Sequence, residues 1–411
     1  MERQILHIDM NNFYASVECA LDQSLRGKAV AVCGNEAERH GIVLAKNYAA
    51  KAYGVQTGEP VVQAKQKCRD LVVVAPHYEV YLKYSRLAHD IYARYTDRIE
   101  PFGMDECWLD VTGTGKSGEA IAHEIREAVK RELGVTVSCG VSFNKVFAKL
   151  GSDMKKPDAV TVIPRASFRE KIWGLPAGEM IGVGRATQKI LTALGVRTIG
   201  DLAKTDPKWL EFKLKSRAVQ LHAFANGWDS SPVLPSDFEV PAKSIGHGIT
   251  TLQDLENEAE VWRVLLELAQ SIGRKLKLYG KKASGVAIDI RDNKLHHQQW
   301  QRVLPMPSQS AMVLAREAYA LFRQSYTWRQ DIRSVTITAI NLVAQDTPVQ
   351  LDLFVDTRKT EKLAKLDDAV FALRERYGMH AVRNACLLGE SKMRRHGIEL
   401  MRMPSGAYLA P

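Results

Sequence analysis

The chain has 411 residues, of which 45% are apolar and 25% are charged, a composition that is typical of globular proteins and excludes fibrous, collagen-like and wholly disordered chains. Its formal net charge of +10 is unevenly distributed, because residues 1–160 sum to zero while 161–240, 241–340 and 341–411 carry +3, +5 and +2. A neutral first part and a basic remainder predict contact with a polyanion, and a scatter of solvated lysines is the alternative that charge alone leaves open.

The first third of the chain is predicted to be mixed α/β, because buried strands alternate with helices. Residues 116–133 show an amphipathic helical pattern, with apolar side chains at Ile121, Ile125 and Val129 and a capping glycine at position 134. Short apolar runs predict strands over 4–8, 71–75 and 135–141. The first of these ends at Asp9, so the N-terminal segment lacks the apolar core of a signal peptide.

The middle and the end of the chain have a different organisation. Residues 174–202 predict a small helical module built on short glycine turns, and residues 228–243, with three prolines, predict a linker. The periodicity that follows predicts a β-α-β-β-α-β unit. Its elements are a strand at 244–252, a helix at 257–278, strands at 283–291 and 297–304, a helix at 309–324 and a strand at 332–343. A second linker is expected over 344–360 and a final helix over 361–378.

Two classes of protein are excluded by patterns along the whole chain. No stretch approaches the roughly 18 consecutive apolar residues of a transmembrane helix, so no membrane association is expected. The six cysteines are widely spaced and form no C-x-x-C pair. Neither a zinc site nor a disulfide framework is therefore predicted, and a reducing, cytoplasmic location fits this pattern.

Three acidic residues are candidates for chemistry. Asp9 stands at a strand end, and Asp105 and Glu106 are adjacent within an apolar and aromatic segment. Neighbouring carboxylates are expensive to bury unless a cation accompanies them, and hard oxygen ligands suit Mg²⁺ or Mn²⁺. The alternative interpretation of the pair is two acids in an exposed turn.

The residues around these acids resemble three ordered motifs of the Y-family (translesion) DNA polymerases. The matching segments are Ile8–Glu18 (IDMNNFYASVE), Asp105–Asp110 (DECWLD), and Gly140–Leu150 (GVSFNKVFAKL) followed by Lys155–Pro157 (KKP). The similarity extends in order over roughly residues 4–343. The chain is most similar to the bacterial polymerase IV (DinB)-like group, with some UmuC-like features.

The resemblance implies an α+β multidomain fold of the right-hand polymerase type. Its expected parts are a palm (1–10 and 77–165), small fingers (11–76), a helix-hairpin-helix thumb (166–233), a linker (234–243), a β-α-β-β-α-β little finger (244–343) and a linker with a helical tail (344–411). Only the segment boundaries come from the periodicity; the names of the parts come from the family.

The resemblance also implies a two-metal site. Asp9, Asp105, Glu106 and the backbone carbonyl of Met10 would hold two Mg²⁺ ions, with Mn²⁺ as an alternative. One ion would lower the pKa of the primer 3′-hydroxyl, and the other would bind the triphosphate and stabilise the leaving pyrophosphate.

Five further residues match nucleotide contacts of the family. Tyr14 takes the position of the steric gate that excludes a ribose 2′-hydroxyl, and Phe13 would support it from below. Tyr48, Lys51 and Lys156 match contacts to the triphosphate, for which a hydroxyl and two cations are suitable partners. The alternatives are an aromatic core pair for Phe13 and Tyr14 and solvated surface positions for the other three residues.

The sequence departs from the family pattern in three places. Lys51 stands where Arg is more common, which replaces a bidentate fork by a point charge. Gly103 stands where Ser usually precedes the acid pair, which leaves the local backbone geometry open. The chain also continues for 57 residues beyond Phe354, and the resemblance assigns no function to 361–411.

DNA contacts are expected in two regions. Residues 181–184 resemble a helix-hairpin-helix turn, in which Gly182 and Gly184 let backbone amides approach a phosphate, with Arg185 and Lys189 beside them. A cluster of cations in the predicted little finger would bind the DNA backbone. It consists of Arg274, Lys275, Lys277, Lys281, Lys282, Arg291 and Lys294. A tight turn and a solvated face are the respective alternatives.

A short apolar motif in the second linker resembles the bacterial sliding-clamp-binding pentapeptide. In it Gln350 would form a hydrogen bond, and Leu351, Leu353 and Phe354 would supply the apolar contacts. Exposed apolar residues in a loop are otherwise hard to explain.

The sequence therefore predicts a monomeric DNA-templated DNA polymerase that adds dNTPs to a primer, with low fidelity and without proofreading. Its expected partners are primer-template DNA, the incoming dNTP and the sliding clamp, and the expected location is the cytoplasm, in association with the nucleoid. The alternatives are a non-catalytic DNA-binding repair adaptor of the same family and a palm-type nucleotidyl cyclase.

Overall fold

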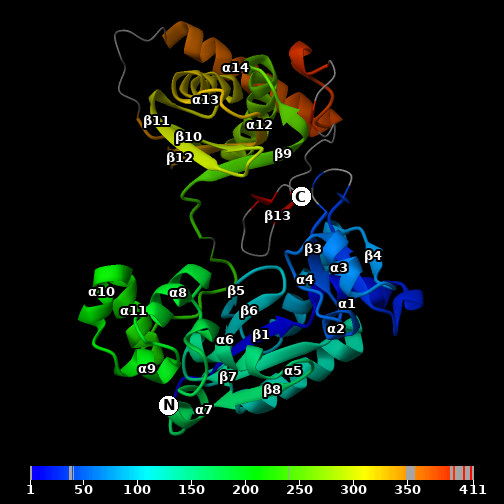
Figure 1. Ribbon diagram of the computed structural model, residues 1–411, viewed down its shortest axis with the longest axis vertical. Coiled ribbons are helices and arrows are strands. Elements are labelled where there is room, and N and C mark those ends of the chain that lie inside the picture. Colours follow the sequence, from blue (N-terminus) through cyan, green and yellow to red (C-terminus); the bar gives the residue numbers. More distant parts are fainter. Residues whose placement is uncertain are drawn as a thin grey trace. The chain divides into compact units, whose positions relative to one another are not determined.

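The computed structural model describes residues 2–36, 39, 41–238, 240–348, 357–388, 392–393, 401–402 and 408–409. Contacts divide the chain into two compact units. Unit 1 comprises residues 1–34, 42–239 and 403–406, and unit 2 comprises 35–41, 240–402 and 407–411. The main division, between residues 239 and 240, falls inside the linker predicted at 234–243. Each unit is described separately (Figure 1).

A five-stranded sheet forms the centre of unit 1 (Figure 1). Its strands, in spatial order, are β5 (Ile99–Pro101), β6 (Glu106–Asp110), β1 (Ile5–Met10), β7 (Val137–Ser142) and β8 (Val160–Ile163). β1 pairs antiparallel with both β6 and β7, and β7 pairs parallel with β8. All residues of β1 and β7 are buried, because helices cover both faces of the sheet.

The helices α6 (Lys145–Met154) and α5 (Gly118–Leu133) cover opposite faces of this sheet, and α4 (Tyr78–Tyr92) packs beside α5. α6 lies very close to β7, since a Cβ on Gly140 would come within 1.9 Å of a backbone oxygen of α6. Only glycine fits at that position. α5 begins two residues later than predicted because Ser117 is its N-cap, and the Ser117 hydroxyl accepts a hydrogen bond from Ala120 N at 3.2 Å.

The segment predicted as fingers forms a small layer of its own beside the main sheet. It holds a three-stranded sheet in the order β3-β2-β4 and three short helices. The bounds are α1 (Phe13–Leu21), the 3₁₀ turn η1 (Gln23–Leu25), β2 (Val30–Cys33), β3 (Val43–Lys46), α2 (Tyr48–Ala52), α3 (Val61–Lys67) and β4 (Val72–Val74). Val43, Val55 and Val61 are among the buried residues of its separate core.

The segment predicted as thumb is helical in its described part. Its elements are α7 (Phe168–Ile172), the 3₁₀ turn η3 (Ala177–Glu179), α8 (Arg185–Ala193), α9 (Ile199–Lys204), α10 (Pro207–Leu214) and α11 (Ser216–Ala225). A capping box between Thr198 and Asp201 starts α9. The helices share one apolar core with Phe147 and Leu150 of α6, which joins them to the main sheet.

Unit 2 contains the predicted β-α-β-β-α-β unit. Its elements are β9 (Ile245–Leu255), α12 (Glu258–Leu278), β10 (Lys281–Asp292), β11 (His297–Ser308), α13 (Ala311–Ser325) and β12 (Ile332–Ala344). The strands form an antiparallel sheet in the order β11-β10-β12-β9. α12 and α13 pack on one face over a large apolar core, whereas Thr336 and Thr338 alternate with the buried residues of β12 and face away from it.

The tail continues unit 2 with α14 (Thr357–Tyr377), the 3₁₀ turn η4 (Ala385–Leu387), β13 (Met401–Arg402) and β14 (Tyr408–Leu409). α14 packs along α12. Arg374 donates to Gln270 at 2.7 Å and to the backbone oxygen of Val382 at 2.8 Å. None of the helices in the described part of the chain has the length and apolar character needed to cross a bilayer.

Candidate active site

The three predicted carboxylates lie at one end of the central strands of unit 1. Asp9 is the cross-strand partner of Glu106 in the antiparallel pair of β1 and β6. Asp105 lies in the bend before β6, where its carbonyl oxygen accepts a hydrogen bond from Met10 N at 2.9 Å. Because cross-strand partners project from the same face of a sheet, pairing of these two strands brings acids that are almost 100 residues apart in sequence to one place.

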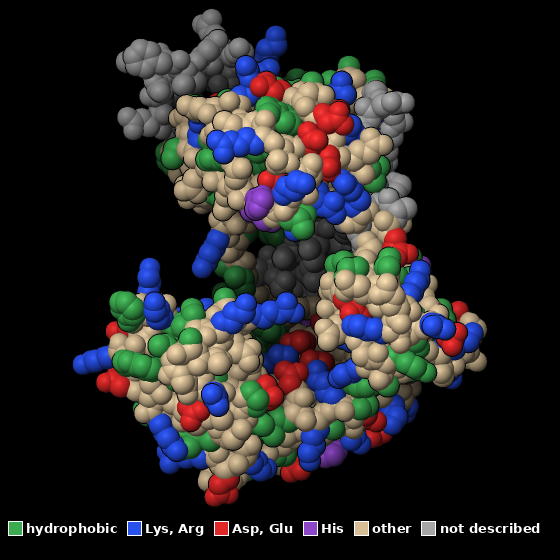
Figure 2. Space-filling model, viewed as in Figure 1, with side chains coloured by type: hydrophobic (Ala, Val, Ile, Leu, Met, Phe, Trp, Pro, Cys, Tyr) green, Lys and Arg blue, Asp and Glu red, His purple; other side chains and the backbone are tan. Residues whose placement is uncertain are grey.

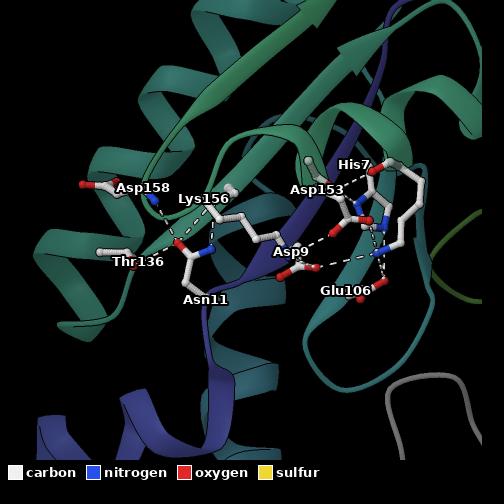
Figure 3. A network of polar contacts seen from close by, with 11 residues as sticks. His7, Asp9, Asn11, Glu106, Thr136, Asp153, Lys156 and Asp158 are labelled. Atoms are coloured by element: carbon white, nitrogen blue, oxygen red, sulfur yellow. Dashed lines mark hydrogen bonds and ion pairs between the residues drawn. The ribbon is translucent and has the colours of Figure 1, made fainter. Parts of the chain in front are cut away.

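Two lysines lie beside these carboxylates, and Figure 3 labels one of them, Lys156, next to Asp9. Lys149 Nζ, from α6, is 2.8 Å from Glu106 and 3.6 Å from Asp9. Lys156 Nζ, from the turn after α6, is 2.7 Å from Asp9. Asp153 pairs with both lysines, at 3.3 and 3.0 Å. Figure 2 shows acidic and basic side chains together in a hollow of unit 1, where charged groups are accessible.

His7 supports Glu106 from inside the protein. Its side chain is fully buried, with Nε2 3.5 Å from Glu106 and Nδ1 2.8 Å from the hydroxyl of Ser152. Burial lowers the pKa of His7 to about 4, so the imidazole is neutral at pH 7. It therefore lies beside Glu106 as a neutral polar ring rather than as a charge.

The three carboxyl groups experience different electrostatic environments. Burial raises the pKa of Asp9 to about 7, and the charge of Lys156 offsets only part of that effect. Burial, together with the neighbouring Glu106, raises the pKa of Asp105 to about 6. Burial acts on Glu106 in the same direction, but the neighbouring His7 and Lys149 side chains outweigh it and lower the pKa to about 2. The chain's own cations thus compensate Glu106 fully and the two aspartates only in part.

This donor set fits a divalent cation in charge and chemistry. Asp105 has no ion pair within the described part of the chain, although it is half-buried. Carboxylate oxygens are the ligands that Mg²⁺ and Mn²⁺ prefer. Among the described residues, however, no three His, Cys, Asp or Glu side chains are gathered closely enough to hold a metal ion. The site therefore has carboxylates that could bind a cation, but they do not form the closed geometry of an assembled metal centre. The ammonium groups of Lys149 and Lys156 lie between these carboxylates.

Tyr14 lies close to the acids on an aromatic platform. Its ring stacks on Tyr81 with a centroid distance of 4.3 Å and an interplanar angle of 11°, and Phe13 packs beside it at 5.5 Å. The Tyr81 hydroxyl donates to the buried carboxylate of Glu18, which holds the platform in place. Burial raises the pKa of Tyr14 to about 12, with Tyr78 and Asp105 adding to the shift. A half-buried, supported ring beside Asp105 is suited to a steric role.

Tyr48 and Lys51 lie on α2, at the side of the fingers that approaches the acids. Asn47 caps this helix by accepting from Ala50 N at 3.0 Å. The Lys51 ammonium lies 5.6 Å from the centre of the Tyr48 ring. Burial raises the pKa of Tyr48, and the charges of Lys156 and Asp9 act on it as well. The structure thus places all three predicted triphosphate contacts in unit 1, with Lys156 in direct contact with the Asp9 carboxylate.

The predicted hairpin turn precedes α8. Gly184 is the N-cap of this helix, and Arg185 and Lys189 are exposed on it. Arg217, from α11, donates to the Gly182 carbonyl oxygen at 2.9 Å and fixes the turn from behind. The backbone amides at the start of α8 therefore remain available to an anion.

The seven predicted cations of unit 2 fall into two groups. The first group lies on α12, behind the sheet, where Arg274 pairs with Glu375 at 2.7 Å and Lys277 with Asp368 at 2.5 Å. Lys275, on the same helix, is only 5% exposed. The second group lies on β10 and the turn after it, and none of its members has an ion pair within the described residues. It consists of Lys281, Lys282, Arg291 and Lys294.

The clamp-binding motif is not placed by the structure. Gln350, Leu351, Leu353 and Phe354 lie outside the described residues. The motif stays a prediction from the sequence.

Comparisons with known proteins identify the family. A family model described as the impB/mucB/samB family matches residues 8–153, and one for the C-terminal domain of that family matches residues 242–353. The chain is 49% identical to "DNA polymerase IV" of Acetivibrio thermocellus, over 96% of this chain and 100% of that protein. It is 36% identical to "DNA polymerase IV 1" of Bacillus subtilis, over 96% of this chain and 95% of that protein.

A solved Y-family DNA polymerase chimera has a similar structure, with a TM-score of 0.73 over 83% of this chain and 99% of that one, at 23% identity. The chain belongs to the Y family of DNA polymerases. The predicted α+β right-hand fold of this Y-family polymerase is thereby confirmed. Membership of the family also implies dependence on divalent metal ions.

Several polar residues at this Y-family site were not singled out from the sequence. Lys149 lies inside a quoted motif, and its spacing of four residues before Asp153 on a helix is a signal that the two would pair. His7 precedes Asp9 by two residues on β1, and the period of a strand places both on one face. Asn11 is also buried in this region, and no residue spacing in the sequence indicates which groups it contacts.

Proposed function

We propose that this Y-family chain is a DNA-templated DNA polymerase that extends primers across damaged or mispaired templates, with low fidelity and no proofreading. The observation that carries the proposal is the meeting of three elements in unit 1. The carboxylates on β1 and β6 lie beside the cations of α6 and its following turn, and the aromatic platform of Tyr14 is adjacent. A metal-dependent transfer of a nucleotide needs these groups together.

Asp9, Asp105 and Glu106, with the carbonyl oxygen of Met10, are proposed to hold two Mg²⁺ ions. Bound there, the ions would supply Lewis acidity and neutralise charge that develops on the reacting phosphate. Lys149 stays paired to Glu106 because three carboxylates surround its ammonium, at 2.8 to 3.6 Å.

The remaining residues of the site are proposed to bind the nucleotide. Lys156, Lys51 and the Tyr48 hydroxyl would bind the triphosphate, for which two cations and a hydroxyl are suitable partners. The Tyr14 ring, supported by Tyr81 at 4.3 Å, would occupy the space that a 2′-hydroxyl needs. The protein therefore contributes positioning and electrostatic stabilisation more than covalent chemistry.

We propose that residues of both units contact the DNA. In unit 1 the backbone amides near Gly182 and Gly184, with Arg185 and Lys189, would hold a phosphate. In unit 2 the cations of β10 and its following turn would contact the DNA backbone without reading bases. The pairings of Arg274 and Lys277, and the burial of Lys275, remove these three from the proposed DNA contacts.

Primer extension with Mg²⁺ tests the proposal directly. The wild-type chain should add dNTPs as the template directs, and Asp105→Ala should lose activity by on the order of a thousandfold, because a metal ligand is removed. Asp97→Ala is the matched control, since Asp97 is an exposed acid whose side chain forms no hydrogen bond or ion pair within the described chain, and it should extend normally.

Two results would contradict this assignment. Equal extension by Asp105→Ala would remove the metal role of that residue. DNA binding without any extension by the wild type would favour the non-catalytic repair adaptor instead, and nucleotide cyclisation without DNA binding at low salt would favour the cyclase.

Clamp binding through residues 350–354 is a separate part of the proposal, supported by the sequence motif. Deletion of these five residues should abolish stimulation of primer extension by a bacterial sliding clamp, while extension without the clamp stays unchanged. Replacing Asp352 alone by Asn, which leaves Gln350, Leu353 and Phe354 in place, is the control. Stimulation that survives the deletion would contradict clamp binding at this motif.

A further inference from the structure

A buried asparagine lies beside the carboxylate site. Asn11 follows Asp9 by two residues at the end of β1 and is 1% exposed. Its Nδ2 donates to the Ser138 hydroxyl at 2.8 Å, and its Oδ1 accepts from Thr136 Oγ1 at 3.1 Å and from Asp158 N at 2.9 Å. Figure 3 shows these contacts as a cluster next to the acids and lysines. A single side-chain amide thus connects three separate segments of the chain.

The segment reached through Asp158 is the turn between α6 and β8. Its backbone is held from two sides. Inside, Asp158 N donates to Asn11. Outside, the Asp158 carboxylate pairs with Lys130 of α5 at 2.8 Å, and Arg126 donates to the Asp158 carbonyl oxygen at 3.2 Å. The inner contact is made by a buried group and the outer contacts are partly exposed, so the inner one is the less screened of the two.

This turn carries Lys156. The Lys156 ammonium lies 2.7 Å from Asp9 and 3.0 Å from Asp153. A lysine side chain is long and flexible, so where its ammonium can act depends on where its backbone is fixed. Asn11 directly follows β1, the strand that carries Asp9. The residue that anchors the turn and the carboxylate that pairs with Lys156 are therefore only two positions apart on the same stretch of backbone.

We propose that Asn11 is a positioning residue for Lys156: it holds the 155–158 turn at the distance from β1 at which the lysine meets the triphosphate of the incoming nucleotide. This inference rests on the proposed function. The amide suits the task better than a hydroxyl or a carboxylate would. Its NH₂ group is fixed by Ser138, which orients the oxygen toward Asp158 N, and it adds no charge next to Asp9.

The structural half of the proposal is tested without DNA or nucleotide. Hydrogen–deuterium exchange on the full chain should show protection of the Asp158 amide, and Asn11→Ala should abolish it while the strands β1 and β7 stay protected. Thr136→Val is the control, because it removes one contact to Asn11 but leaves the bond to Asp158 N. Unchanged protection in Asn11→Ala would overturn the proposal even in an active polymerase.

The functional half is a double-mutant cycle read by nucleotide kinetics. Asn11→Ala should raise the KM for dNTP about tenfold, the loss expected of a charge-assisted contact, while the Kd for primer-template DNA stays the same. In a Lys156→Ala background, Asn11→Ala should cause no further increase. An equal increase in both backgrounds, or no increase in either, would overturn the role through Lys156.

Asn11→Ser makes the cycle decisive even where Asn11→Ala does not fold. Serine keeps a polar group near Ser138 and Thr136 but is too short to reach Asp158 N, so the same rise in KM is expected. A wild-type KM would refute the proposal. Absence of primer extension by the wild type is a different result: it refutes the proposed function, and the role of Asn11 toward the triphosphate is refuted with it.

Discussion

Cations pair with acids in two regions of the molecule, and the two regions differ in what the pairing leaves available. At the candidate active site, Lys149 and Lys156 pair with acids, while Asp105 has no ion pair within the described chain. Along α12 of unit 2, Arg274 and Lys277 each pair with an acid of α14 and are covered by that helix. The first arrangement is suited to binding, and the second is a packing interface.

The comparison shows that a count of cations along the sequence does not identify a nucleic-acid surface. Whether a cation can bind nucleic acid depends on whether its ammonium or guanidinium group already pairs with an acid. Of the seven predicted cations of unit 2, the four on β10 and its following turn have no ion pair within the described residues. In unit 1 single residues at fixed positions carry the proposed chemistry, so we expect single substitutions to have large effects there and small, additive effects in unit 2.

After the loss of activity expected for Asp105→Ala, the largest of these effects is predicted for the aromatic platform. Tyr14→Ala should reduce discrimination against ribonucleotides by about 10- to 100-fold, because a cavity replaces the ring that would exclude the 2′-hydroxyl. The measurement is the ratio of kcat/KM for dCTP to that for CTP in primer extension. Tyr14→Phe keeps the stacked ring and should keep the ratio. Sugar selectivity that is unchanged in Tyr14→Ala would remove the gate role.

A smaller effect is predicted for the cations of β10 and its following turn in unit 2. The double variant Lys281→Ala/Lys282→Ala should weaken binding of primer-template DNA and reduce the slope of log Kd against log salt concentration by about two, one for each lost phosphate contact. Sequence preference should not change, since phosphates are contacted rather than bases. A slope equal to that of the wild type would show that these lysines do not contact DNA. The proposed difference between the cations of β10 and those of α12 would then be wrong.

Much of the fold could be predicted from the sequence, because its signals are local. All six elements of the β-α-β-β-α-β unit lie within a few residues of their predicted bounds, since strands and amphipathic helices follow their own periods. The acids Asp9, Asp105 and Glu106 were found through a resemblance that spans short motifs, and β1 and β6 bring them together as expected.

The contacts that the sequence did not reveal are long-range. Arg274 and Lys277 meet acids 101 and 91 residues further along the chain, and no periodic pattern announces such a pair. Lys275 was grouped with its neighbours by sequence distance, although it projects from a different side of α12 and is buried. Asn11 lies inside the Ile8–Glu18 motif, but its contact with the turn gave no signal, because its partner there is a backbone amide, which any sequence provides.

The smallest effect on DNA binding is predicted for the paired cations of α12. Arg274→Ala/Lys277→Ala removes the same number of positive charges as the β10 variant, yet it should leave DNA affinity within about twofold and the salt slope unchanged, since these charges are already neutralised by α14. Its cost should appear in stability instead. Two partly exposed ion pairs contribute about 1 kcal/mol together, so the free energy of unfolding in urea should fall by about that amount. The two double variants remove the same charge. If Arg274→Ala/Lys277→Ala reduced the salt slope as much as Lys281→Ala/Lys282→Ala, net charge, and not whether each cation already has a partner, would determine DNA affinity.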